Sequence, residues 1–142
     1  MIIRYNKAIL ALLALMLSAC ALPAVEDKHA DAGTRMQGVA ARFEQARRGG
    51  GMAAVVSEID KCYAAATFPV IRVYALRDCL VLDYVGYRTD VTIGRRLFHQ
   101  ALPFFETQTF TARASHYAQL DGFTSPGQLA NYFKDAGTLG PV

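Results

Sequence analysis

The residue patterns that usually mark enzymes and metal sites are absent from this 142-residue chain. It has no Gly-x-Ser-x-Gly elbow, no Walker phosphate loop and no His-Glu-x-x-His helix. Histidine occurs only as His29, His99 and His116, and none of these has another histidine or a cysteine three or four residues away. Metal ligands normally occur at such spacings. We therefore predict no catalytic residue, no metal site and no cofactor, and we expect a protein that is not an enzyme.

The chain also lacks an apolar run long enough to cross a membrane. The longest run, from Ala8 to Leu17, is half of the about 20 apolar residues that a spanning helix needs. Arg4 and Lys7 precede this run, and the small residues Ser18-Ala19 follow it. Charged, apolar and small residues in this order are typical of a secretory signal. We predict that residues 1–19 are a cleaved signal peptide.

The tetrapeptide Leu17-Ser18-Ala19-Cys20 resembles the lipobox of bacterial lipoproteins. In that family the cysteine thiol receives a diacylglyceryl group and becomes the new N-terminus, and acyl chains such as palmitate anchor it. Each buried methylene adds about 0.8 kcal/mol to anchoring. The resemblance implies lipidation of Cys20 and a protein that faces the periplasm from the cell envelope. The residue after the cysteine is Ala21 and not Asp, and in this the chain resembles lipoproteins that enteric bacteria sort to the outer membrane. An ordinary secretory signal with an accidental cysteine is the alternative.

The mature chain has no large excess of positive or negative charge. Arg4 and Lys7 leave with the signal, so the formal charge of +3 falls to about +1, whereas a nucleic-acid binder needs a strongly basic stripe. We therefore expect no nucleic acid among the partners. The expected partners are the membrane, through the lipid anchor, and another protein of the cell envelope.

Cysteine is also scarce, with three in the whole chain. If Cys20 carries lipid, Cys62 and Cys79 remain, and an exported protein meets an oxidising compartment in which such pairs close. We predict a Cys62–Cys79 disulfide. Its loop of about 17 residues corresponds to a stabilisation of roughly 3 kcal/mol in the chain-entropy description.

The mature chain divides into a tether and a helical domain. Residues 21–33 have few large apolar side chains and cannot offset the entropy of ordering. Helical spacing of apolar residues over 34–48 predicts a short, loosely docked helix, ended by Gly49-Gly50-Gly51. We assign residues 20–51 to a lipidated tether with a short helix and residues 52–138 to the helical domain.

Two helical patterns open this domain. Met52 to Ala66 has its apolar residues on one face, which indicates an amphipathic helix. Thr67-Phe68-Pro69 ends it, with Pro69 suited to opening the next helix. Val70 to Tyr87 is apolar almost all round, which is typical of a helix in the middle of a bundle. The short connection makes the pair an antiparallel hairpin that brings the two cysteines together.

Capping residues mark the remaining helices. We expect Asp90 to cap a helix that runs to Leu102, and Thr107 or Thr109 to begin another that Gly122 ends. Ser125-Pro126-Gly127-Gln128 forms a capping box for the last helix. No strand is expected after the tether. The fold class is therefore all-α, a small bundle of about five helices with a disulfide-linked helical hairpin.

Charged residues within the central pattern have two interpretations. Arg77 projects from the apolar arc near Tyr74 and Tyr84, so it either pairs with a carboxylate of another helix or forms the floor of a tyrosine-edged binding groove. Asp78 and Asp83 share this pattern with Arg72 and Arg77, so paired structural charges are a simpler account of the two carboxylates than acid–base chemistry. Neither carboxylate shares a face with Arg77, so the partner of Arg77 must come from another helix or from outside. Farther on lie three more cations, Arg88, Arg95 and Arg96, which form either a solvated face or a contact with anionic headgroups or an acidic partner.

These patterns favour a membrane-tethered envelope lipoprotein that acts as a non-catalytic binding or assembly module. Arg77, Tyr74 and Tyr84 are the candidate binding residues, on the speculative groove interpretation. An envelope enzyme of unknown reaction and a purely structural lipoprotein are the alternatives.

Overall fold

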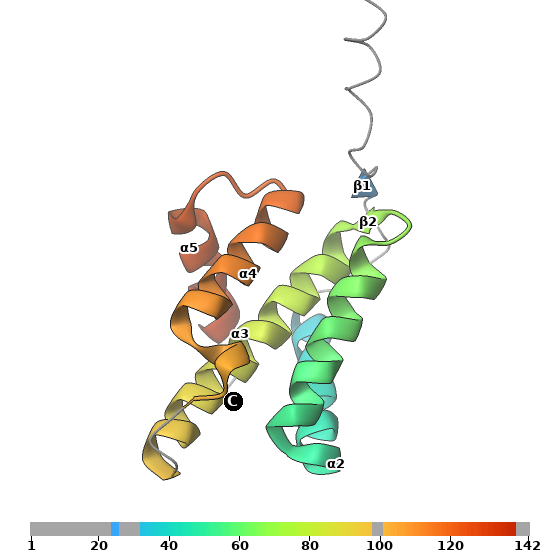
Figure 1. Cartoon of the computed structure of the whole chain (residues 1–142). Coiled ribbons are helices and arrows are strands. Elements are labelled where there is room, and N and C mark those ends of the chain that lie inside the picture. The colour runs from blue at the N-terminus through green and yellow to red at the C-terminus, as the bar shows by residue number, and fades with distance from the viewer. Residues whose placement is uncertain (1–23, 26–31, 98–100, 139–142) are drawn as a thin grey trace, which may run out of the picture.

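The computed structural model describes residues 24–25, 32–97 and 101–138, which are mostly helical (Figure 1). The helices are α2 (Ala32–Thr67), α3 (Val73–Leu97), α4 (Thr107–Leu120) and α5 (Pro126–Thr138), and η1 (Pro103–Phe105) is a single 3-10 turn. Two short strands, β1 (Ala24–Val25) and β2 (Ile71–Arg72), pair beside the hairpin turn. The predicted all-α fold is confirmed. Cys20, the predicted signal peptide, His29 and His99 lie outside the described residues.

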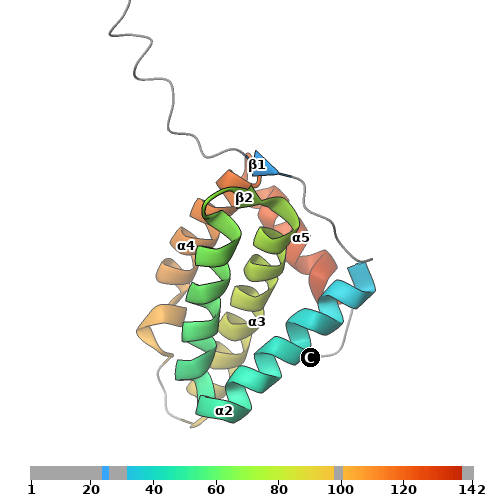
Figure 2. The same cartoon turned by 90° about the vertical axis from the view of Figure 1, so that its right-hand side faces the viewer.

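Helix α2 is two helical segments joined at a kink (Figure 2). The kink lies at Gly50 and Gly51, and Gly51 has a φ of 66°, a left-handed conformation that favours glycine. The glycine triplet therefore separates two helices, as the sequence predicts. The first segment is not loosely docked, however, because Val39 and Phe43 are buried in the same core as the rest of the domain.

Helix α3 occupies the middle of the bundle, with α2 on one side and α4 and α5 on the other (Figure 1). In its first half, apolar residues on different sides of the helix are fully buried, including Leu76, Leu80 and Leu82. It begins at Val73, after the turn and β2, so the prediction that Pro69 opens it at Val70 is wrong.

Asp90 does not begin a new helix, because α3 runs through it without a break. Asp90 is buried, and its Oδ2 accepts a hydrogen bond from the backbone N–H of Leu102 at 2.7 Å. No proline or glycine run interrupts the helix before Asp90. The Asp90 carboxylate instead binds the backbone N–H of the residue that precedes η1. The prediction of a helix from Asp90 to Leu102 is therefore wrong.

The hairpin of α2 and α3 is closed by the Cys62–Cys79 disulfide, with the two Cα atoms 5.5 Å apart. This confirms the predicted pairing. Beside the turn, β1 pairs with β2 in parallel, so a strand does occur after the tether, contrary to expectation. A pairing of two residues per strand is too short to leave an alternating pattern in the sequence.

Close packing joins η1 to the hairpin. Gly86 of α3 lets the Phe105 ring approach so closely that a Cβ built on Gly86 would lie 2.9 Å from the ring. Phe105 is fully buried there.

No helix among the described residues is long and apolar enough to span a bilayer.

The two C-terminal helices begin and end largely as predicted. Gly122, with a φ of 88°, donates its N–H to Gln119, and Phe123 donates to Ala118, the pair of bonds of a Schellman motif. Ser125 Oγ accepts from the N–H of Gln128 at 3.3 Å. The Gln128 side chain accepts from the backbone N–H of Thr124, one residue before the cap, and not from that of Ser125. Only one of the two hydrogen bonds of a capping box is therefore formed.

Candidate functional site

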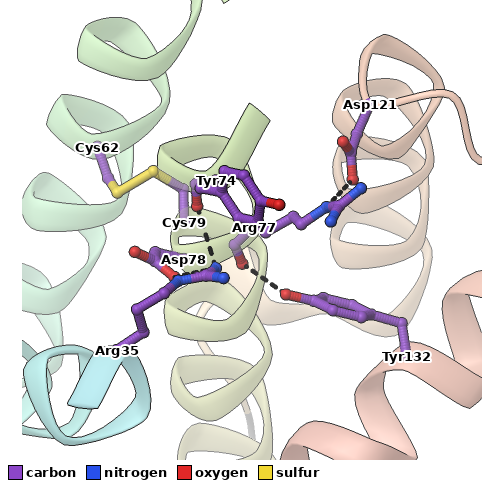
Figure 3. A network of polar contacts seen from close by, with 8 residues as sticks. All are labelled: Arg35, Cys62, Tyr74, Arg77, Asp78, Cys79, Asp121 and Tyr132. Carbon is purple, nitrogen blue, oxygen red and sulfur yellow. Dashed lines mark hydrogen bonds and ion pairs between the residues drawn. A yellow bond between two sulfur atoms is a disulfide. The ribbon is translucent and has the colours of Figure 1, made fainter. Parts of the chain in front are cut away.

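Arg77 is paired with a carboxylate of the fold. Its Nε donates to Asp121 Oδ2 at 2.8 Å (Figure 3). The Asp121 side chain is fully buried, whereas 34% of the Arg77 side chain is exposed. Asp121 is the C-cap of α4, so the partner comes from another helix. The interpretation of Arg77 as an ion-paired residue packed on the core is therefore confirmed.

The surroundings of this pair shift the pKa values of both partners. Burial raises the pKa of Asp121, and Arg77 opposes that rise. The hydrogen bond to Asp121 raises the pKa of Arg77. Asp121 Oδ1 is buried and has no hydrogen-bond partner among the described residues. Arg77, and at longer range Arg35, thus favour the charged carboxylate against its burial.

Tyr132 of α5 joins the same network. Its hydroxyl donates to the backbone oxygen of Arg77 at 3.3 Å, which connects α5 to α3 (Figure 3). Burial raises the pKa of Tyr132 to about 12. The phenol therefore stays protonated and keeps this hydrogen bond well above neutral pH.

Asp78 finds its partner in the first segment of α2. Arg35 donates to Asp78 Oδ1 from Nε at 3.0 Å and from Nη2 at 2.6 Å, and Nη2 also donates to the backbone oxygen of Tyr74. The Tyr74 ring lies within cation–π distance of both Arg35 and Arg77. Asp78 is thus part of a structural ion pair, as expected, and its partner is Arg35, because the kink at the glycine triplet brings α2 back across α3.

A second buried ion pair, whose cation the sequence reasoning missed, lies between α3 and α4. Arg113 donates to both oxygens of Asp83, and Tyr63 donates to Asp83 Oδ2 at 3.0 Å. Burial raises the pKa of Asp83 against the opposing effects of Arg113 and Tyr63, and it raises the pKa of Tyr63 well above its usual range. The only signal in the sequence was an acidic residue on a helix that is apolar almost all round. Asp83 is thus part of a structural ion pair, as expected, with Arg113 as the partner.

Tyr84 does not belong to the Arg77 network. Its ring stacks on Phe133 at 4.5 Å, and its hydroxyl accepts from Arg88 at 3.4 Å. Tyr74 therefore lies beside Arg77, whereas Tyr84 lies in an aromatic cluster with Phe110 and Phe133. The three predicted binding residues do not line one groove.

A pocket of about 410 Å³ lies beside the disulfide, between α2 and α3. Two ion pairs set its walls, Arg42 with Glu58 at 2.8 Å and Asp78 with Arg35. Lys61 and Arg72 are exposed at the pocket, and Arg72 donates to the backbone oxygen of Ala65. The remaining lining residues are small or belong to the disulfide: Cys62, Ala65, Ala66, Ala75 and Cys79. This pocket was not predicted, since its residues come from the polar side of one helix and the start of the next.

The remaining charged and histidine candidates lie at the surface. His116 is exposed, with its ring edge-on to Tyr117, and the described part of the chain holds no group of three or more potential metal ligands. Arg96 is exposed, and the Arg95 side chain lies outside the described residues.

No family model matches the chain, and comparisons with curated proteins and with solved structures find no significant match.

Proposed function

We propose that this chain is a membrane-tethered lipoprotein of the cell envelope, and that its helical domain is a non-catalytic binding or assembly module. Lipid on Cys20 would hold the domain on the periplasmic side of a membrane, with the outer membrane favoured by Ala21. The lipobox resemblance supports the anchor. The pocket beside the disulfide is the observation that supports a binding role.

The pocket is suited to binding because its walls are held in place before any partner arrives. The Cys62–Cys79 disulfide joins the two helices at its base, and the Arg42–Glu58 pair orders two of its long side chains. Side chains that are already ordered lose less entropy when a partner binds. A pocket of this kind needs no catalytic group to act as a docking site.

The charges at the pocket indicate an acidic partner. The carboxylates of Glu58 and Asp78 are each engaged by an arginine, whereas Lys61 and Arg72 are exposed and Arg72 hydrogen-bonds to the backbone oxygen of Ala65. A guanidinium binds carboxylates with a pair of directed hydrogen bonds. We therefore propose that the pocket receives an acidic segment of another envelope protein.

Site-specific photo-crosslinking in intact cells tests this proposal. A photoreactive residue replaces Lys61 in one strain and Lys134, an exposed lysine of α5, in the control strain. The proposal predicts a discrete crosslinked protein at position 61 that is absent at position 134. The product should be lost when Arg72→Glu is added. Equal products at both positions, or a product that survives Arg72→Glu, would contradict the proposed binding site.

A further inference from the structure

Phe68 has the largest exposed fraction among the large apolar side chains that the structure describes, at 74%. It directly follows the last residue of α2, and its backbone N–H donates to the Ala64 oxygen at 3.2 Å. The ring therefore projects from the end of a helix at a defined position. Single exposed apolar residues are common on protein surfaces. The position of Phe68 relative to the proposed lipid anchor sets it apart.

The parallel strand pair places Phe68 and the anchor at the same end of the molecule. Ala24 pairs with Ile71 and Val25 with Arg72. Because the strands are parallel, the N-terminal end of β1 lies beside the N-terminal end of β2, which the Phe68 turn immediately precedes. An antiparallel pair would place the N-terminal end of β1 beside the start of α3 instead.

The chain length between Cys20 and β1 makes this arrangement restrictive. Cys20 precedes Ala24 by four residues, which reach at most about 14 Å. Leu97, at the other end of α3, lies roughly 36 Å from Val73 along the helix axis. A lipid on Cys20 thus holds the Phe68 end, and not the Leu97 end, near the bilayer.

The charge of this end suits the surface of a bacterial membrane. Between Asp60 and Asp78 the chain contains no carboxylate, and Lys61 and Arg72 are exposed there, whereas Arg77 is paired with Asp121. Anionic headgroups attract exposed basic residues close to the surface. Aromatic rings are favoured at the boundary between headgroups and acyl chains.

We infer that the turn holding Phe68 is a membrane-contacting tip, in which the Phe68 ring enters the headgroup region of an anionic bilayer. This inference rests on the proposed lipid anchor at Cys20. It makes the β1–β2 pair an orienting clamp, which holds the Phe68 turn toward the bilayer.

Tryptophan fluorescence tests the tip, because the chain contains no tryptophan of its own. Phe68→Trp provides a single reporter, and Leu97→Trp is the matched control, since Leu97 is 66% exposed at the far end of α3. The lipidated protein is inserted into vesicles of phosphatidylethanolamine and phosphatidylglycerol with brominated acyl chains. We expect a blue-shifted emission and several-fold stronger quenching at position 68 than at position 97.

A second preparation separates this inference from the anchor on which it rests. Residues 20–142 carrying Phe68→Trp are joined through the Cys20 thiol to a maleimide phospholipid, which places lipid at Cys20 whether or not the cell does so. Quenching at position 68 in this preparation supports the tip even if the cellular protein lacks acyl chains. Missing acyl chains in the cellular protein would refute only the lipoprotein proposal. Equal or absent quenching at positions 68 and 97, or a blue shift without vesicles that indicates self-association, would overturn the tip.

Discussion

Arg113 binds both carboxylate oxygens of Asp83, with Nε donating to Oδ2 at 2.9 Å and Nη2 to Oδ1 at 2.8 Å. The Asp83 side chain is fully buried, and only 14% of the Arg113 side chain is exposed. Arg113 also donates to the backbone oxygen of Phe104 and lies 3.6 Å from the centroid of its ring. One guanidinium thus joins α3, α4 and the η1 turn.

Removing Arg113 should be among the most destabilising single changes in the domain. Arg113→Met leaves Asp83 buried without its cation, and breaking a buried pair in this way costs about 3–5 kcal/mol. Urea unfolding at neutral pH measures the loss. Burial already raises the pKa of Asp83, so in the variant the folded state takes up a proton as the pH falls, and the deficit should become smaller in acid.

The matched control removes both charges. Asp83→Leu combined with Arg113→Met leaves no unpaired buried charge, and the double variant should unfold at a higher urea concentration than Arg113→Met alone. A cost below about 1 kcal/mol for the single change, or a double variant weaker than the single one, would contradict the role of this pair.

Arg77→Met should destabilise the domain less than Arg113→Met does. Asp121 would lose the guanidinium that binds its Oδ2, but 34% of the Arg77 side chain is exposed, so solvent screens part of the effect. We expect a loss of about 1–3 kcal/mol in thermal or urea unfolding. Burial raises the pKa of Asp121, so this deficit should also shrink as the pH falls and the folded carboxyl takes up a proton. An equal deficit in acid and at neutral pH would contradict this account of the pair.

Gly86→Ala tests the contact between α3 and η1. The new methyl group would lie 2.9 Å from the Phe105 ring and 3.2 Å from Ile59 Cδ1. Overpacking of this kind costs typically 1–3 kcal/mol. Gly38→Ala is the control, because it lies in α2 with nothing within 4 Å of the added Cβ, and there alanine should stabilise the helix by roughly 0.5–1 kcal/mol. Similar unfolding midpoints for the two variants would contradict the packing.

Tyr132 should make the domain sensitive to alkali. Its pKa rises from 10.0 to about 12 on folding, so between these values the unfolded chain releases a proton that the folded chain retains. Stability therefore falls as the pH rises through this window, by on the order of 2–3 kcal/mol in total. Tyr132→Phe should flatten the pH dependence of the unfolding free energy, leaving the part due to Tyr63. An unchanged slope in this variant would refute the assignment.

Much of the fold could be predicted from the sequence because it depends on local patterns. Periodic apolar residues identify the second segment of α2, whose Val55 and Ile59 are fully buried. The all-round apolar pattern identifies α3 as the central helix. The partner of Cys62 followed from elimination, because only one other cysteine remained once Cys20 was assigned to lipid.

The partners of the buried charges could not be predicted in the same way. Asp78 pairs with Arg35, which is 43 positions away, and Asp83 pairs with Arg113, which is 30 positions away. Periodicity places a charge on one face of a helix, but it does not say which other helix packs against that face. The kink at Gly51 decides this for Arg35, and its bend angle is a property of the packed structure.

Asp90 illustrates a related limit. An aspartate before an apolar run is the usual mark of a helix start, but the same carboxylate can accept a backbone N–H from any neighbouring segment. Here it accepts from Leu102 while remaining inside α3. The pocket beside the disulfide was missed for a similar reason, because it exists only after the two halves of the hairpin pack.

The most direct test of the account is the intact mass and N-terminal peptide of the protein extracted with detergent from the cell membranes. The account predicts a chain that begins at Cys20, carries a diacylglyceryl group with further acyl mass, and stays with the membrane in high salt. Cys20→Ser should lose the acyl mass and the cleavage at residue 19. A wild-type chain that starts elsewhere, or that carries an unmodified Cys20 and leaves the membrane in salt alone, would contradict the central claim.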